Sequence, residues 1–205
     1  MINGPFKLFE PFADRLRIVI FTKEDGMMSD SNAATQLGLK DRAGLDQVHG
    51  NKTVVMKGPS DGVVQADGMF TSVPDLALII RSADCQNFVI YDPEKNVVGL
   101  LHVGWRGLVA DAIPAFFTSL KGEYGIGPED VYVGAGPSLC QKCAEFSNPT
   151  QELPDVEERF FDGRHVDLRG VAKNSLLSLG VSEGRIEVHP DCTCCAPESY
   201  YTYRG

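Results

Sequence analysis

Residues 81–108 read R-S-A-D-C-Q-N-F-V-I-Y-D-P-E-K-N-V-V-G-L-L-H-V-G-W-R-G-L, and this stretch decides the fold that we expect of the chain. It holds two apolar runs, 88–91 and 97–103, separated by the polar segment D-P-E-K-N. Proline fixes φ in that segment, and Asp and Asn offer local hydrogen bonds, which indicates a turn. Both runs are too apolar for surface strands. Together they predict a buried β-hairpin.

This hairpin would bring a thiol and an imidazole together at its open end. If Tyr91 lies near Val97, Cys85 and His102 lie almost opposite each other, and opposed residues have Cβ atoms about 4.5–5.5 Å apart. Such a pair can share a metal ion or act as a nucleophile and its base. A buried structural cysteine beside a hydrogen-bonded core histidine is the simpler interpretation of the two residues alone. A shift of one residue in register would turn one side chain to the other face.

A third residue, His49, favours a metal site. It stands in Q-V-H-G at 47–50, before the strand-like run 53–56. Histidine beside glycine suggests a turn at which backbone and side chain can approach a ligand. Two histidines and one cysteine form a zinc site with an open fourth position, as in catalytic rather than structural zinc.

Several short motifs stand in an order known from one family. They are Q-V-H-G at Gln47, A-D-G at Ala66, S-A-D-C at Ser82, H-V-G-W-R-G at His102, G-P-S-L at Gly136 and C-T-C-C-A-P-E-S-Y-Y-T-Y-R at Cys192. Because it carries these motifs in this order, the sequence resembles the YfiH-like family, which has been called the polyphenol oxidase or laccase-domain family. More recently it has been called a family of purine nucleoside phosphorylases that includes FAMIN. The resemblance extends over nearly the whole chain from Phe21 onward.

The resemblance implies a site, a fold and an activity. The metal triad of the family falls on His49, Cys85 and His102, which would be both metal-binding and catalytic. The implied fold is a layered α/β/β/α arrangement with mixed sheets. The implied activity is zinc-dependent phosphorolysis of purine nucleosides such as inosine and adenosine, with deamination of adenosine in the same pocket.

Composition narrows the class of protein. A chain of 205 residues with 43% hydrophobic content suffices for one well-buried domain, 1–205, and we see no repeat or linker. The net charge of −9 argues against nucleic-acid and membrane-surface partners. No apolar run approaches the about 20 residues of a membrane helix, and the N-terminus lacks a signal pattern. We therefore expect a cytoplasmic protein with reduced cysteines. The family resemblance implies small-molecule partners, a purine nucleoside and phosphate. The oligomeric state stays open.

The remaining elements predict an α+β fold. We expect strands at 16–21, 53–56, 76–80, 131–133, 186–188 and 200–203, and helices at 30–37, 108–120, 154–161 and 167–179. Pro114 should kink its helix or mark a broken start. Asp167 is a candidate N-cap, and Gly180 ends the last helix. The order lacks a regular β-α-β alternation, which favours α+β.

Four further polar residues flank the three expected ligands. Asp67 is either a turn carboxylate bonded to nearby amides or the acceptor for a ligand histidine. Arg81 and Asp84 pair with each other or hold a polar substrate, and Asp84 is our candidate acid–base or orienting group. Arg106, between glycines at a helix start, is the candidate for phosphate, with pairing to an acidic residue as the alternative.

The other five cysteines form two groups, C-x-x-C at 140–143 and C-T-C-C at 192–195. They allow a four-cysteine structural zinc site. The C-x-C-C spacing of the second group argues against that site. By the family resemblance, positions like Cys143, Cys192 and Cys195 carry cysteine outside the metal triad. Cys140 and Cys194 receive no role.

Three functions fit these residues. Zinc-dependent nucleoside phosphorolysis ranks first, because zinc suits the ligand set. Copper-dependent polyphenol oxidation ranks second: a His₂Cys set resembles a blue-copper centre, but a multicopper oxidase needs a further His-rich cluster and the chain has only four His. The third is a metal-binding protein without turnover, such as one that edits a peptidoglycan precursor, which the resemblance to bacterial family members implies.

Overall fold

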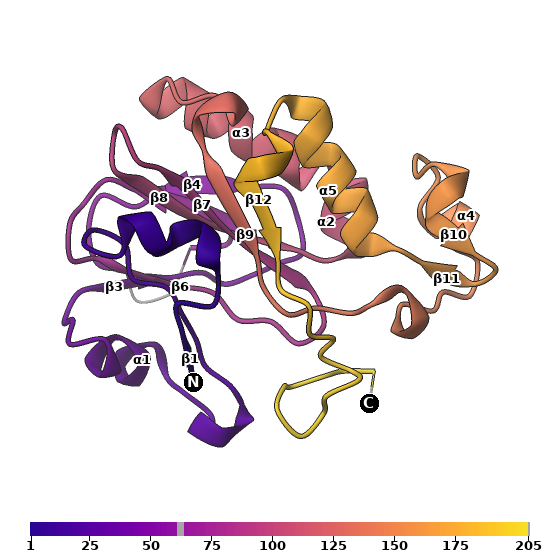
Figure 1. The fold of residues 1–205 in the computed structure, drawn as a ribbon, viewed down its shortest axis with the longest axis horizontal. Helices are drawn as coiled ribbons and strands as arrows, with labels where there is room; N and C mark the ends of the chain where they lie inside the picture. Colours follow the sequence, from indigo (N-terminus) through magenta and orange to yellow (C-terminus); the bar gives the residue numbers. More distant parts are fainter. Residues whose placement is uncertain (61–63, 205) are drawn as a thin grey trace.

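The computed structural model describes residues 1–60 and 64–204, and its centre is a six-stranded mixed sheet (Figure 1). The strand order is β12-β9-β7-β8-β5-β4. In chain order, the strands are β4 (Thr53–Val55), β5 (Gly68–Thr71), β7 (Gln86–Asp92), β8 (Val97–Val103), β9 (Tyr132–Ala135) and β12 (Ile186–Val188). The pairs β4–β5 and β9–β12 are parallel, and the other three are antiparallel. The sequence at 63–68 also predicts a strand end that runs into a turn at 66–68. This stretch lies partly outside the described residues, and Gly68 begins strand β5 instead.

The hairpin is confirmed, with a register one residue away from the expected one. Asp92 pairs with Val97, so that Tyr91 faces Val98. The reason lies in the turn: the Asp92 carboxylate accepts a hydrogen bond from the Lys95 amide at 2.7 Å, which keeps Asp92 as the last paired residue. The ladder alternation puts 85, 87 and 102 on one face of the sheet, because 102 pairs with 87.

One face of the sheet is covered by helices α2 (Trp105–Val109), α3 (Ala112–Tyr124) and α5 (Leu168–Leu179), as Figure 1 shows. The expected helix 108–120 is two helices, because Asp111 takes a left-handed conformation with φ of 56°. Pro114 then lies in the first turn of α3, where proline costs no hydrogen bond, so the broken start is confirmed. Helix α5 begins and ends as predicted. The Asp167 carboxylate accepts from the Gly170 amide, and Gly180 has φ of 110°.

The other face carries a second, smaller layer. It is the parallel pair β3 (Arg42–Gly44) and β6 (Ala77–Ile79), which packs on the main sheet through Leu45, Met56 and Met69. Helix α1 (Asp30–Gln36) packs on β3 from outside. Its N-cap is Ser29, whose hydroxyl accepts from the Asn32 amide. Together with the helical face, this confirms the mixed α/β fold with helices outside two β layers.

Three expected elements differ. Only β2 (Val19–Ile20), paired with β1 (Ile2–Asn3), forms in the stretch 16–21. In the stretch 154–161 only a 3₁₀ helix, Glu158–Phe160, forms. The α-helix α4 (Pro149–Glu152) lies earlier and ends before Leu153, whose helical backbone is disfavoured by Pro154. The stretch 200–203 is not a strand, since the Tyr200 amide donates to the Ala196 carbonyl and the Tyr203 amide donates to a carboxylate described below.

A further short hairpin pairs β10 (Phe161–Asp162) with β11 (His165–Val166). No helix in the described ranges combines the length and the apolar character that a membrane crossing requires.

Candidate metal centre

His49, Cys85 and His102 come together as predicted. Their potential ligand atoms all lie within 4.8 Å of one another. His49 lies in the loop after β3 with φ of 61°, Cys85 lies one residue before β7, and His102 lies within β8. The imidazole of His102 is buried, the thiol of Cys85 is half-buried and His49 is exposed. The observed register, one residue away from the expected one, favours this convergence, because it puts Cys85 and His102 in diagonal positions on the same face of the sheet.

A single carboxylate, Asp67, organises two of the three residues. It is fully buried and accepts from the backbone amides of Val48, His49 and Gly50 at 3.3, 2.9 and 2.7 Å. Its Oδ1 also lies 2.9 Å from Nδ1 of His102. Both interpretations of Asp67 are therefore correct at once. With Nδ1 engaged as a donor, Nε2 of His102 is left as the atom that can bind a metal.

Two local features keep the three ligands close. The Gln47 side chain donates to the Arg81 carbonyl at 2.7 Å and accepts from the Arg81 amide at 2.8 Å, which ties the His49 loop to the segment before Cys85. Gly104 follows β8, and a Cβ there would lie 2.8 Å from the Cys85 sulfur and 3.3 Å from His49 Cδ2. Glycine is thus required at 104 for steric reasons.

The electrostatics of the site favour a cation. Burial raises the pKa of the Cys85 thiol to about 11, the charges of Asp84 and Asp67 add to the rise, and Arg106 opposes it. Burial lowers the pKa of His102, against the hydrogen bond and charge of Asp67. Both shifts favour the uncharged forms of the two side chains. A bound cation would favour the thiolate form of Cys85, since the same carboxylates attract the cation and the cation displaces the thiol proton. The donor set fits a metal ion.

Arg81 and Asp84 do not pair with each other, which corrects one alternative from the sequence. The Arg81 guanidinium pairs with Asp30 of α1. Asp84, with φ of 79°, is buried, and its carboxylate is occupied by a segment more than 100 residues away. It accepts from the hydroxyls of Thr193 and Thr202 and from the amides of Tyr203 and Arg204, at 2.7, 2.7, 2.7 and 3.1 Å.

Arg106 is placed differently. Its guanidinium lies 4.3 Å from the centroid of the Trp105 ring, it is exposed, and no carboxylate of the described residues forms an ion pair with it. The ligand triad, Arg81, Asp84 and Arg106 all line one cavity of about 1510 Å³. All six predicted site residues thus border one space.

Sequence reasoning argued against one group of side chains that the structure brings together. Cys140, Cys143, Cys192 and Cys195 also converge, with their sulfurs within 4.8 Å of one another. The spacing argument against such a group was wrong, because Cys192 and Cys195 are themselves a C-x-x-C pair with Cys194 inserted. The partners of Asp84 were missed as well, and no local sequence signal marks contacts of such separation.

The chain belongs to the family described as multi-copper polyphenol oxidoreductase laccase, whose profile matches residues 23–205. Two particular relatives carry more specific names. The purine nucleoside phosphorylase of Deinococcus radiodurans is 31% identical over 184 residues, which cover 84% of this chain and 68% of that protein. Adenosine deaminase RL5, from an unknown prokaryotic organism, is 26% identical over 148 residues, which cover 67% of this chain and 56% of that protein.

Solved structures agree on the fold. YlmD from Geobacillus stearothermophilus matches with a TM-score of 0.74 at 25% identity, covering 85% of this chain and 73% of that one. YfiH from Bacillus licheniformis matches with the same TM-score and coverage at 23% identity. The YfiH-like resemblance is confirmed. The chain spans between 56% and 73% of the length of these four proteins.

Proposed function

We propose that this chain is a zinc-dependent purine nucleoside phosphorylase that also deaminates adenosine. The observation that carries the proposal is the convergence of His49, Cys85 and His102 on the wall of a large cavity. The names of the two relatives support the substrate class. A cavity of about 1510 Å³ has room for a nucleoside and phosphate together.

Zinc is the metal that the donor set favours. Three protein ligands with an open position are the pattern of catalytic zinc. When bound, zinc acts as a Lewis acid and lowers the pKa of a bound water to about 7. Copper oxidation by several coppers would need more histidines nearby, and the remaining two stand elsewhere. His165 pairs with Asp162 in the short hairpin, and His189 packs on Phe6.

Phosphorolysis would proceed by displacement at the ribose. A phosphate oxygen forms a bond to C1′ while the bond from C1′ to the purine nitrogen breaks. The electron pair leaves with the purine, which takes up a proton, and the products are free base and ribose 1-phosphate. In deamination, water adds to the purine ring and ammonia leaves, so that adenosine becomes inosine.

The residues of this chain have distinct parts in the proposal. Arg106 binds phosphate, because its guanidinium is exposed to the cavity, held on Trp105 and not neutralised by a described carboxylate. Asp84 orients the Cys85 loop rather than transferring protons, because its oxygens already accept four hydrogen bonds. Arg81, which is paired with Asp30, lines the nucleoside end of the cavity in this assignment.

The test incubates zinc-loaded protein with inosine and with adenosine, each with and without phosphate. Free base, ribose 1-phosphate and inosine are separated by chromatography, and His49→Ala is the matched control. We expect base release only with phosphate, inosine from adenosine in either condition, and neither product from the variant. If wild-type protein at high concentration forms none of these products while it binds zinc, the enzymatic proposal is wrong, and binding without turnover takes its place. Copper content with phenol oxidation would instead favour the second function.

A further inference from the structure

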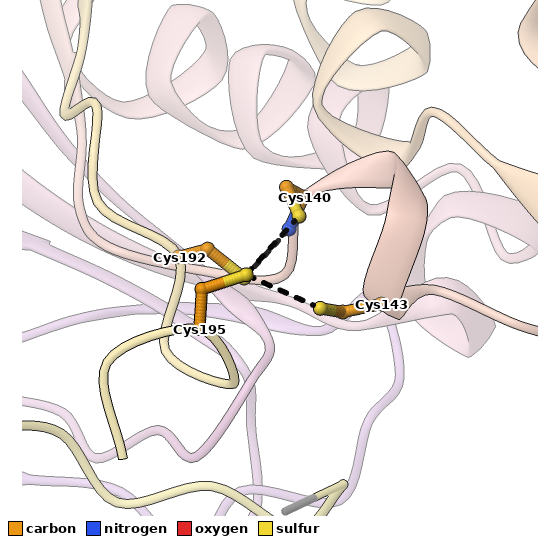
Figure 2. Close-up of side chains that lie close together, drawn as sticks. All are labelled: Cys140, Cys143, Cys192 and Cys195. Atoms are coloured by element: carbon orange, nitrogen blue, oxygen red, sulfur yellow. Dashed lines mark hydrogen bonds between the residues drawn. The ribbon is translucent and has the colours of Figure 1, made fainter. Parts of the chain in front are cut away.

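The four cysteines outside the triad form a compact group of sulfur atoms. Figure 2 shows the side chains of Cys140, Cys143, Cys192 and Cys195 pointing toward a common centre. The Cys195 sulfur lies 3.8 Å from that of Cys140 and 3.5 Å from that of Cys143. All four sulfurs lie within 4.8 Å of one another. Two C-x-x-C pairs, about 50 residues apart in sequence, are therefore brought into one cluster.

The distances match a single tetrahedral metal ion. A disulfide needs sulfurs about 2.05 Å apart, and all six cysteines are free thiols. Zinc–sulfur bonds of about 2.3 Å in a tetrahedron put neighbouring sulfurs about 3.8 Å apart. The two measured separations, 3.5 and 3.8 Å, are close to that value. A multinuclear iron–sulfur cluster would spread its ligands over a wider space than a single ion does.

The backbone around the sulfurs is already ordered for this role. The amides of Cys143 and Ala144 both donate to the Cys140 carbonyl, which closes the first C-x-x-C into a tight turn. The Cys140 amide donates to the Cys192 sulfur at 3.2 Å, and the Ala196 amide closes the second turn on the Cys192 carbonyl. An amide aimed at a sulfur favours its thiolate form, the form that binds metal.

A cation from another element holds the two turns together. The Arg169 side chain of α5 donates to the Ser138 hydroxyl at 3.0 Å and to the carbonyls of Ser138 and Asp191. Ser138 and Asp191 precede the two cysteine pairs. The segments are therefore docked without relying on the sulfurs.

We propose that Cys140, Cys143, Cys192 and Cys195 bind a second, structural zinc ion. Four thiolates leave no open position, which distinguishes this site from the His49–Cys85–His102 centre. The inference does not depend on the proposed function.

The second site would support the first. Thr193, between the two cysteines of the second pair, donates to the Asp84 carboxylate, and the Leu139 amide donates to the Asp84 carbonyl at 3.1 Å. Both metal-bearing turns thus contact the residue that precedes Cys85. A metal that locks these turns would also fix the Cys85 loop.

The test counts metal in protein purified without added metal. Zinc per chain is measured by mass spectrometry in wild-type protein and in Cys143→Ser, Cys195→Ser, His49→Ala and Cys143→Ser/His49→Ala variants. Cys194→Ser is the matched control, because Cys194 lies in the same turn but outside the four-sulfur group. We expect two zinc ions in wild type and Cys194→Ser, one in each of the other single variants and none in the double variant. Cys143→Ser with two zinc ions, or iron in place of zinc at this site, would overturn the assignment.

A second measurement covers the case in which the serine variants do not fold. His49→Ala keeps all four cysteines, and its metal-free form is titrated with Co²⁺. We expect one equivalent to produce thiolate-to-cobalt absorption with the strong visible bands of a tetrahedral site. Absence of these bands in folded His49→Ala would refute the second site whether or not the protein has nucleoside phosphorylase activity.

Discussion

Replacing Asp67 by Asn tests the organisation of the triad with minimal change in volume. Oδ1 of Asp67 accepts from the His49 amide and His102 Nδ1, and Oδ2 accepts from the amides of Val48 and Gly50. An asparagine keeps one oxygen. In either orientation its NH₂ group faces two donors where the carboxylate offered an acceptor.

The loss can be estimated from these contacts. A hydrogen bond to a charged group contributes about 1.5–3 kcal/mol, so that losing two costs at least about 3 kcal/mol of unfolding free energy. That is a large part of the about 5–15 kcal/mol that stabilises a typical protein. If the NH₂ group faces His102, the imidazole must accept at Nδ1, and its proton moves to Nε2, the atom expected to bind metal. We therefore also expect a 10–100-fold loss of zinc affinity, as for other groups that orient ligand histidines.

Two assays separate these effects. Guanidinium unfolding of metal-free protein gives the stability, and competition with a chromophoric chelator gives the zinc affinity. Asp46→Asn is the control, because Asp46 is exposed and accepts one side-chain hydrogen bond, from Gln65, and a change within about 0.5 kcal/mol is expected there. The reasoning is refuted if Asp67→Asn unfolds at the wild-type denaturant concentration and keeps wild-type zinc affinity.

Three further outcomes follow from single contacts. Gly104→Ala should lower zinc affinity at least tenfold, because the new Cβ would approach the Cys85 sulfur to 2.8 Å. Gly122→Ala is the control, because its Cβ meets nothing within 4 Å, and it should bind zinc normally. Equal zinc affinities of the two variants would contradict the steric role of Gly104. Arg106→Ala should raise KM for phosphate more than KM for inosine. Arg159 also lies on an aromatic ring but away from the cavity, so that Arg159→Ala should change neither constant. Equal rises in both constants for Arg106→Ala would point to a structural role. Burial of Tyr200, together with its hydrogen bond to Asp191, raises the pKa of its hydroxyl from 10.0 to about 12. The folded protein therefore keeps the Tyr200 proton up to a higher pH than the unfolded chain does. The contribution of this proton to the free energy of unfolding is present below pH 10 and is lost as pH rises toward 12. Tyr200→Phe should therefore show a smaller fall in unfolding free energy between pH 10 and 12 than wild type. An unchanged pH profile of unfolding would show that Tyr200 does not cause the fall.

The sequence predicted those parts of the fold that local pattern controls. The 81–108 hairpin followed from two apolar runs around a turn, and α5 followed from its cap, its apolar face and Gly180. The register was one residue off because the side chain of Asp92, not the strand pattern, sets the length of the turn. Of the helix predicted at 154–161, only the 3₁₀ helix Glu158–Phe160 forms.

The site was predictable as far as motifs reached. His49, Cys85 and His102 were assigned correctly as a cluster, since the hairpin and the Q-V-H-G turn are local features. The four-cysteine group was within reach, and only a narrow interpretation of its spacing excluded it. The partners of Asp84 were out of reach, because contacts across 109 to 120 residues leave no periodic or local mark.

The long reach of the Asp84 contacts also bears on how the protein is synthesised. His49, Cys85 and His102 have all been translated by residue 102, but Thr193, Thr202 and the two amides that hold Asp84 come roughly 90 residues later. At a usual elongation rate of about 5–20 residues per second, several seconds pass between synthesis of His102 and synthesis of the donors that hold Asp84. Every nascent chain interrupted between residues 103 and 192 therefore carries a full set of ligands but lacks the four donors that hold the Asp84 carboxylate. Completion of translation, rather than the appearance of the ligands, is the event that fixes the geometry around Cys85.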